Sequence, residues 1–385
     1  MVGPWPAVER ATLGLELMKF RMSLSGALGL TLLPLLGGCA ALTENSTRLQ
    51  NNMASVPPTG RMISVDGRQV HLYCTGTGAP TVILETGKGG GSVHWAWIQR
   101  DVAKVSRVCS YDRPGYGWSD PTEAPMDAVN TSRQLYALLK AANEKEPYVA
   151  VGQSIGGDYA RMFATEHRQE VAGLVLVDAS SPSVLTTYAE VGLPPFEKSA
   201  MASVLASSGS VLQVGKNLGL VRTTYSETWN KLPPDVRPTM EAFVANPQLI
   251  PTSVKESQSL GDSLMQVRAL DSLGDMPVTV IASDKWIDPD PDLAAKRAEW
   301  NKRQQRNWLA ISTNSRFLIV PGADHMSLLS TKEHAAAVAD SIVKMVKTVK
   351  EHMRSPGRTT RHQSPRQSSV GPCLTAQRWC GPSRS

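Results

Sequence analysis

The sequence predicts an α/β fold, with a mostly parallel sheet of about eight strands and helices on both faces. Two observations predict it: short apolar runs alternate with segments of helical periodicity, and a hairpin signal precedes the first of them. The chain has 385 residues, enough to bury a large core. Its composition, 41% hydrophobic and 19% charged, excludes a chain disordered throughout and a multi-pass membrane protein.

The sheet is predicted to open with an antiparallel hairpin and to continue with parallel strands. Segments 62–65 and 69–73 flank Asp66-Gly67, a dipeptide typical of two-residue hairpin turns. Further strands are expected at six apolar runs: 81–84, 107–111, 148–151, 174–177, 278–282 and 317–320.

Helical periodicity occupies the spaces between these strands. Leu135, Leu138 and Leu139 share one face of a helix expected at 127–142, and 155–165 is expected to be the helix that follows strand 148–151. A closing amphipathic helix places five apolar residues on one face: Ala335, Val338, Ala339, Ile342 and Val346.

The stretch 181–273 contains helical and proline-marked segments but no strong strand run. It is too long to be a loop within a compact domain. We therefore expect an inserted, mainly helical cap at 181–273, which interrupts a core formed by 61–180 and 274–350.

The net charge of +6 belongs to the two ends of the chain. Residues 1–39 carry a net +1 and residues 351–385 a net +5, which leaves 40–350 formally neutral. A neutral body gives no reason to expect nucleic acid as a partner. The segment 351–385 is rich in Pro, Ser, Gly and Arg and is expected to be a disordered basic tail.

The N-terminal region has the features of an export signal. Lys19 and Arg21 precede an apolar run at 24–36, which is too short to span a membrane as a helix. The tetrapeptide Leu-Gly-Gly-Cys that ends at Cys39 resembles the bacterial lipobox, in which the cysteine is lipidated and becomes the new N-terminus. An ordinary signal peptide with an incidental cysteine is the alternative.

This resemblance implies that 1–39 is a signal peptide and that 40–60 is a linker. Residues 1–17 precede the basic region and suggest a start site chosen too far upstream. The expected partner is a lipid bilayer, reached through lipidated Cys39. By the same resemblance, Ala40 after the cysteine favours the periplasmic face of the outer membrane of the bacterial envelope.

A G-x-S-x-G motif at 152–156 lies between an expected strand and an expected helix. The two glycines permit a tight turn that lifts the Ser154 hydroxyl above the sheet. The turn also directs the Ile155 N–H, at the start of the helix, toward a developing oxyanion. The alternative is a structural Gly-Ser turn.

A serine hydroxyl needs a base near neutral pH, and that base needs an acid to orient it. Among seven histidines, His325 is the one that follows an expected strand end and precedes the closing helix. The nearest rival is His94, which follows a glycine-rich loop and which we interpret as a helix-start or pocket-wall residue.

The order of these motifs resembles that of the α/β-hydrolase superfamily over about residues 61–350. Three further segments carry the resemblance: YDRPGYGWS at 111–119, LVLVDA at 174–179 and PGADH at 321–325. The resemblance implies an α/β-hydrolase fold with nucleophile, acid and histidine in that order along the chain.

The acid has two candidates. Most members of the superfamily place it after strand seven, which here gives Asp284. Some place it after strand six, which here gives Asp178. We favour Asp284 and keep Asp178 as the alternative.

The oxyanion loop departs from the family pattern. The family usually has His-Gly after strand three, whereas this chain has Glu-Thr-Gly-Lys at 85–88, followed by three glycines. By alignment, the Lys88 backbone N–H is the second oxyanion donor beside that of Ile155. The loop lacks the G-K-[ST] ending of a phosphate-binding loop.

Five cysteines are too few for a disulfide scaffold. In the α/β-hydrolase fold the second and fourth strands are neighbours, so we expect Cys74 and Cys109 to form a disulfide. Two buried free thiols are the alternative. The sequence contains no metal-ligand spacing, and we expect neither metal nor cofactor.

These features predict a serine hydrolase that cleaves small-molecule carboxylic esters through an acyl-enzyme on Ser154. Epoxide hydrolases and dehalogenases of the same fold use an aspartate nucleophile, so Ser154 disfavours both. The alternatives are a thioesterase or lysophospholipase with the same triad, and a non-catalytic hydrolase-like binding lipoprotein. The missing oxyanion-loop histidine favours the last of these.

Overall fold

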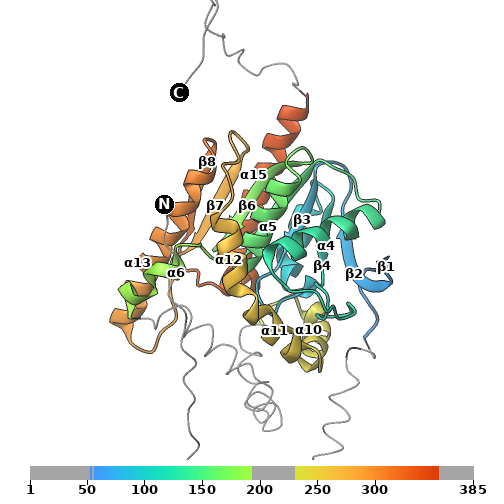
Figure 1. The fold of residues 1–385 in the computed structure, drawn as a ribbon, viewed down its shortest axis with the longest axis horizontal. Helices are drawn as coiled ribbons and strands as arrows, with labels where there is room; N and C mark the ends of the chain where they lie inside the picture. Colours follow the sequence, from blue (N-terminus) through green and yellow to red (C-terminus); the bar gives the residue numbers. More distant parts are fainter. Residues whose placement is uncertain (1–52, 54–55, 193–229, 355–385) are drawn as a thin grey trace, which may run out of the picture. The chain divides into compact units, whose positions relative to one another are not determined.

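The computed structural model describes residues 53, 56–192 and 230–354. Within these residues one eight-stranded sheet has the order β1-β2-β4-β3-β5-β6-β7-β8 (Figure 1). β2 is antiparallel to β1 and β4, and the remaining neighbours are parallel. The predicted fold class is confirmed. The strands are β1 (Arg61–Val65), β2 (Arg68–Thr75), β3 (Thr81–Glu85), β4 (Val108–Tyr111), β5 (Tyr148–Gln153), β6 (Val171–Val177), β7 (Val278–Ser283) and β8 (Ser315–Val320).

The predicted hairpin joins β1 and β2. Val65 pairs with Arg68, and the two residues between them have positive φ, 49° at Asp66 and 78° at Gly67. Positive φ at both central residues is the geometry that Asp-Gly turns favour, and its twist matches that of the flanking strands. The register of the hairpin is therefore set by the dipeptide that predicted it.

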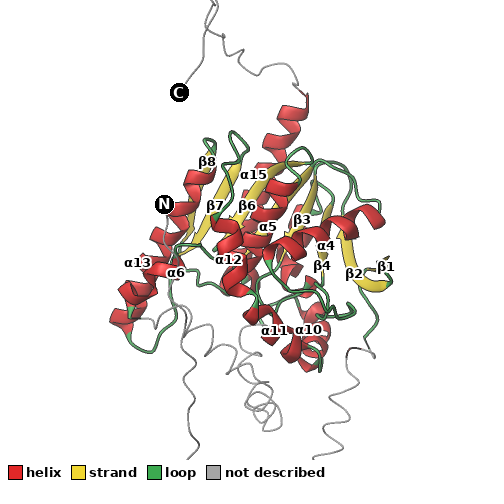
Figure 2. Cartoon of the chain, in the orientation of Figure 1, coloured by secondary structure: helices red, strands yellow, loops and turns green. Residues whose placement is uncertain are grey.

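The central strands are buried because helices cover both faces of the sheet (Figure 2). Alternate residues of β3 enter different cores: Ile83 packs in the cluster that contains α4 and α5, and Val82 and Leu84 pack in the cluster that contains α3 and α15. The core helices are η1 (Ser92–Trp95), α3 (Ala96–Val102), α4 (Ala128–Ala141), α5 (Ile155–Glu166), α13 (Pro291–Asn307), η4 (Trp308–Ile311), α14 (Ser327–Ser330) and α15 (Lys332–Arg354).

The closing helix α15 confirms the predicted apolar face, since Ala335, Val338, Ala339, Ile342 and Val346 are all buried. Its C-terminal end corrects one boundary. The helix continues to Arg354, so residues 351–354 belong to it rather than to the predicted tail. The physical reason is that no proline or glycine interrupts the helical pattern before Pro356.

Between β6 and β7, all the regular elements of the described residues are helical. We refer to residues 181–273 as the insertion. Its described helices are α6 (Val184–Thr187), η2 (Tyr188–Val191), η3 (Pro234–Val236), α10 (Arg237–Ala245), α11 (Leu249–Gln258) and α12 (Leu260–Arg268). Phe243 and Leu249 of the insertion pack in one buried cluster with Tyr116 and Met126 of the core.

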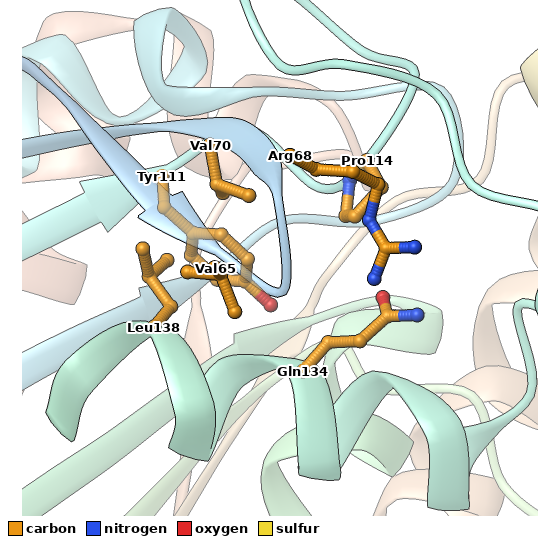
Figure 3. A pocket seen from close by; sticks show the side chains of 7 residues that line it. All are labelled: Val65, Arg68, Val70, Tyr111, Pro114, Gln134 and Leu138. Carbon is orange, nitrogen blue, oxygen red and sulfur yellow. The ribbon is translucent and has the colours of Figure 1, made fainter. Parts of the chain in front are cut away.

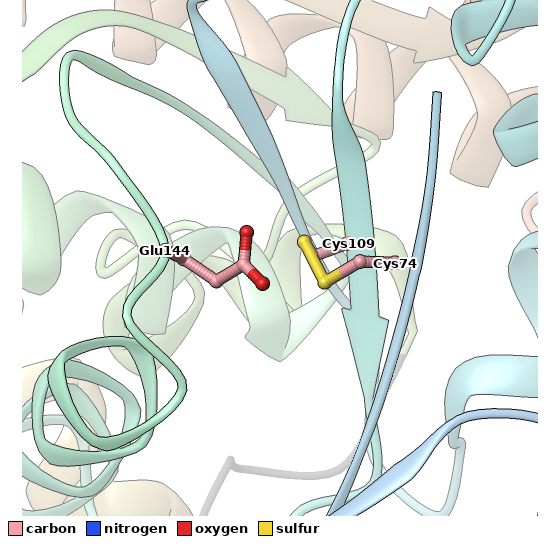
Figure 4. A group of neighbouring side chains, drawn as sticks. All are labelled: Cys74, Cys109 and Glu144. Carbon is pink, nitrogen blue, oxygen red and sulfur yellow. A yellow bond between two sulfur atoms is a disulfide. The ribbon is translucent and has the colours of Figure 1, made fainter. Parts of the chain in front are cut away.

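The predicted disulfide is present. Cys74 of β2 lies directly opposite Cys109 of β4, and their sulfurs are bonded (Figure 4). Glu144 lies beside the two sulfurs and forms ion pairs with Arg61 and Arg107. Among the described residues, Cys74, Cys109 and Glu144 are the group whose ligand atoms lie close enough together to hold a metal ion. Sulfurs bonded to each other cannot act as thiolate ligands, however.

Several predictions concern residues outside the described ranges. The signal peptide 1–39, lipidated Cys39, most of the linker 40–60, part of the insertion (193–229) and the tail from residue 355 are among them. They remain predictions. In the part of the chain that the structure describes, no helix has both the length and the apolar character needed to cross a bilayer.

Candidate active site

The G-x-S-x-G segment forms a strained turn between β5 and α5. Ser154 has φ 56° and ψ −131°, a conformation that non-glycine residues rarely adopt. A Cβ atom at Gly152 would lie 2.1 Å from the Gly156 carbonyl oxygen, and one at Gly156 would lie 2.5 Å from the Glu85 carbonyl oxygen. Both positions therefore require glycine, and the predicted elbow is confirmed as a local structure.

Backbone hydrogen bonds hold the turn in place. The Ser154 N–H donates to the Val177 carbonyl oxygen at 3.2 Å, and the Ser154 carbonyl oxygen accepts from the Gly157 and Ser180 N–H groups at 2.9 and 3.0 Å. The next residue, Ile155, is the first of α5, so its N–H has no acceptor within the helix. That N–H lies at the positive end of the helix dipole.

The loop after β3 runs directly against the serine. A Cβ atom at Gly87 would lie 2.9 Å from the Ser154 Cβ and 2.4 Å from the Gln153 Oε1. Gly87 of the predicted oxyanion loop thus lies against the turn that carries Ser154, and Lys88 is the residue that follows Gly87.

His325 is paired with Asp178. The His325 Nδ1 lies 2.7 Å from the Asp178 Oδ2, and the Asp178 carboxylate is buried at the end of β6. Asp178 also accepts hydrogen bonds from the Ser283 N–H (2.9 Å), the Ser283 hydroxyl (3.0 Å) and the Asn301 amide (2.8 Å). Burial alone would raise the pKa of Asp178, but the hydrogen bond and charge of His325 outweigh it, and the pKa lies below its ordinary value.

The preference for Asp284 is wrong as to geometry. One Asp284 oxygen accepts from the Gly322 N–H at 3.1 Å and the other lies 3.0 Å from the Lys302 Nζ. These contacts orient Asp284 toward the loop that precedes His325 rather than toward the imidazole. β6 and β7 are parallel neighbours, so both deliver a carboxylate to the same edge of the sheet, and spacing alone did not distinguish them.

Gln153 is a site residue that the sequence did not single out. Its Nε2 lies 3.0 Å from the His325 Nε2. Because the His325 Nδ1 faces a carboxylate and is therefore the N–H donor, Nε2 is the acceptor, and the Gln153 amide donates to it. Among the described residues, no side-chain hydrogen bond involves the Ser154 hydroxyl. In this structure the basic nitrogen is thus engaged by Gln153.

Two other histidines, His94 and His71, are buried and hydrogen-bonded to neighbouring parts of the fold. His94 is buried at η1, its Nδ1 lies 3.1 Å from the Gly91 N, and burial lowers its pKa to about 4. His71 forms a buried pair with Asp112, with its Nδ1 2.9 Å from the carboxylate, but its Nε2 already accepts from the Gly60 N–H. Both His71 nitrogens are thus engaged by groups other than Ser154, and the His94 Nδ1 is engaged by Gly91.

A small hollow lies elsewhere, between the β1–β2 hairpin and α4. It is lined by Val65, Arg68, Val70, Tyr111, Pro114, Gln134 and Leu138 (Figure 3). Its lining does not include Ser154, His325 or Asp178, so this hollow is not part of the candidate site.

Comparison with protein families agrees with the observed fold. A family model described as "alpha/beta hydrolase fold" matches residues 80–331. The Uncharacterized protein YqjL of Bacillus subtilis is 32% identical over 116 residues, 30% of this chain and 46% of that protein. A 2-hydroxy-6-oxononadienedioate/2-hydroxy-6-oxononatrienedioate hydrolase of Cupriavidus pinatubonensis is 34% identical over 140 residues, 34% of this chain and 48% of that enzyme. Each match spans less than half of the relative.

Solved structures with the same fold cover most of the chain. The Cif epoxide hydrolase of Acinetobacter nosocomialis has a TM-score of 0.61 at 15% identity and covers 80% of this chain and 96% of its own. An esterase of Thermogutta terrifontis has a TM-score of 0.51 at 18% identity and covers 75% and 98%. At such identities the likeness concerns the fold alone.

Proposed function

Since the chain belongs to the alpha/beta hydrolase fold family, we propose that it is a hydrolase and that it cleaves carboxylic esters with Ser154, His325 and Asp178 as its catalytic triad. The observation that carries the proposal is the strained serine turn together with an imidazole held 2.7 Å from a buried carboxylate. In this proposal the triad acid is Asp178, the alternative to the Asp284 that the sequence favoured.

The chemistry follows from the positions of these groups. His325 Nε2 exchanges its contact with Gln153 for the Ser154 hydroxyl, takes the proton, and the serine oxygen attacks the ester carbonyl. The Ile155 and Lys88 N–H groups stabilise the oxyanion of the tetrahedral intermediate. His325 then protonates the leaving alcohol, and in the second half it deprotonates the water that releases the acid. Asp178 remains ionised and stabilises the imidazolium.

A thioesterase or a lysophospholipase would use the same steps and remains a second candidate within acyl transfer. A non-catalytic binding protein is disfavoured, because a strained serine turn, a His325–Asp178 pair and a helix N-terminus at Ile155 together form the arrangement that acyl transfer needs.

A fluorophosphonate probe tests the nucleophile. We expect the folded wild-type protein to be labelled at Ser154, since the probe reacts with an activated serine, and Ser154→Ala to remain unlabelled. Ser64→Ala, at an exposed position of β1, serves as the matched control and should label like the wild type. Mass spectrometry of the labelled peptide identifies the site, and absence of label on folded wild type would contradict the enzyme assignment. A p-nitrophenyl ester series of increasing acyl length then ranks substrates.

The rate should depend on pH through His325. Burial alone would lower the pKa of His325. The hydrogen bond and the charge of Asp178 outweigh this effect and raise the pKa above the ordinary 6.5. Only the neutral imidazole accepts the serine proton, so kcat/KM should fall as pH decreases through a midpoint above 6.5. Measured from about pH 5 to 9, the midpoint should move to lower pH in Asp178→Asn. An unchanged midpoint in that variant would show that another group controls the acid limb.

We also propose that the protein is exported and attached to a bilayer through lipidated Cys39. The lipobox-like tetrapeptide supports this, and so does the Cys74–Cys109 disulfide, because disulfides persist mainly in oxidising compartments.

A further inference from the structure

A buried ion network lies next to the oxyanion loop and joins the core to the insertion. The Arg113 guanidinium is 2.6 Å from a Glu85 oxygen and 2.9 Å from a Glu256 oxygen, and the exposed fractions of the three side chains are 3%, 2% and 1%. Glu85 ends β3, Arg113 follows β4, and Glu256 belongs to α11 of the insertion. Glu256 thus reaches the core from a segment more than a hundred residues away in sequence.

Two of these three side chains, Arg113 and Glu256, bind the backbone of the oxyanion loop. Arg113 donates to the Thr86 carbonyl oxygen at 2.5 Å and to the Gly87 carbonyl oxygen at 2.8 Å. Glu256 accepts from the Gly89 N–H at 3.1 Å. These bonds flank Lys88 on both sides, so the conformation of the loop depends on where Arg113 and Glu256 are held.

The direction of one of these bonds bears on the chemistry. The Gly87 carbonyl and the Lys88 N–H belong to the same peptide bond, and this bond is trans. In a planar trans peptide the two groups point in opposite directions. Because Arg113 binds the carbonyl, the Lys88 N–H is aimed to the other side of the loop, and Gly87 itself lies against Ser154.

Glu256 is in turn fixed by two tyrosines and holds the guanidinium in place. The Tyr116 hydroxyl donates to it at 2.5 Å and the Tyr159 hydroxyl at 3.1 Å. The carboxyl groups of Glu85 and Glu256 both face the buried Arg113 guanidinium. Burial raises the pKa of Glu85, and the charge of Arg113 acts against this.

We propose that Glu256 is a positioning residue for catalysis: by pairing with Arg113 and accepting from Gly89, helix α11 of the insertion sets the oxyanion loop against Ser154. The proposal rests on the ester-cleaving function proposed above. It means that the oxyanion hole is completed by the insertion and is not a property of the core alone. Oxyanion donors act only when they lie within a few tenths of an ångström of the place where charge develops, so a small shift of this loop affects the rate.

The expected signature is a change in kcat rather than in KM. Oxyanion hydrogen bonds strengthen in the transition state, so misplacing the loop should lower kcat and kcat/KM together. We expect Glu256→Gln to lower kcat for p-nitrophenyl acetate by about 10- to 100-fold, with KM changed by less than about 3-fold. The affinity for an aryl boronic acid, which forms a tetrahedral adduct with the serine, should fall in parallel.

Glu144→Gln is the matched control. Glu144 is also a buried carboxylate paired with an arginine, 2.5 Å from the Nε of the partly exposed Arg107. It lies near Tyr148 at the beginning of β5, whereas Ser154 follows the end of that strand. It should lose stability while kcat changes by less than about 2-fold. Melting temperature and circular dichroism of both variants separate loss of fold from loss of rate.

Each outcome bears on the proposal. A folded Glu256→Gln protein with wild-type kcat overturns it, while labelling of wild-type Ser154 shows that the triad assignment still stands. Should Glu256→Gln not fold, Tyr116→Phe replaces it, since it removes one hydrogen bond to Glu256 and should lower kcat by about 3- to 10-fold. A wild-type kcat in Tyr116→Phe then overturns the proposal. A wild-type protein that neither labels nor hydrolyses esters instead overturns the proposed function, and this inference with it.

Discussion

Replacing Asp178 by Asn is expected to lower kcat/KM for an ester by about 10⁴-fold, the size of effect that follows when a triad histidine is held in the wrong tautomer. The surroundings of Asp178 determine how the amide would sit. Its Oδ1 accepts from two N–H donors, the Ser283 backbone and the Asn301 side chain, so the amide oxygen of the variant should take that position. The NH₂ group then faces His325.

This orientation has a specific consequence for the base. An NH₂ group at the Oδ2 position donates to the His325 Nδ1, which drives the ring proton to Nε2. Nε2 can then no longer accept the serine proton. Stability should change little, since the Ser283 hydroxyl can rotate to accept from the amide.

Asp284→Asn is the comparison that decides between the two acids. Asp284 binds the Gly322 N–H and Lys302, and a neutral amide can keep the first contact, so kcat/KM should stay within about 3-fold of wild type. Full activity in Asp178→Asn together with a large loss in Asp284→Asn would return the acid to the position that the family pattern favoured.

Gly152→Ala is expected to lower kcat/KM by about 10²-fold or more and to destabilise the protein by about 1–3 kcal/mol. The added methyl group would lie 2.1 Å from the Gly156 carbonyl oxygen and 2.5 Å from the Gly156 carbonyl carbon. Both are backbone atoms of the first turn of α5, so relief requires that this turn move. Ser154 and the Ile155 N–H would move with it.

Gly78→Ala separates this collision from ordinary glycine strain. Gly78 has φ +88°, yet a Cβ atom there meets nothing within 4 Å. It should cost about 1 kcal/mol of stability and leave kcat/KM within about 2-fold. Thermal unfolding and steady-state kinetics measure both quantities, and wild-type kcat/KM in Gly152→Ala would mean that the turn tolerates more space than its geometry indicates.

Local patterns predicted much of this fold because local physics determines it. The Asp66-Gly67 turn sets the hairpin register, and strands buried on both faces appear in the sequence as continuous apolar runs. The serine turn was predictable for the same reason, since close backbone contact at Gly152 and Gly156 demands glycine.

The parts that sequence reasoning missed depend on contacts between distant segments. Asp178 and Asp284 follow adjacent parallel strands, and only side-chain direction distinguishes them. Gln153 occupies a variable position of its motif, so its type carried no signal. Glu256 meets Gly89 across 167 residues, and nothing in the helical pattern of α11 marks it as different from a surface glutamate.

The buried guanidinium of Arg113 limits how the protein can be re-engineered. Insertions between β6 and β7 are attractive units to exchange when a different substrate range is wanted. Here the exchange would remove Glu256, one of two buried carboxylates that pair with Arg113, and would leave Glu85 of the core as the other. Breaking such a buried pair on one side is expected to cost up to about 3–5 kcal/mol. A replacement insertion that keeps Glu256 at the same position of α11 preserves the Arg113–Glu256 ion pair. A replacement that lacks Glu256 should be combined with substitution of Arg113. The core and its insertion are therefore best treated as a single inherited unit.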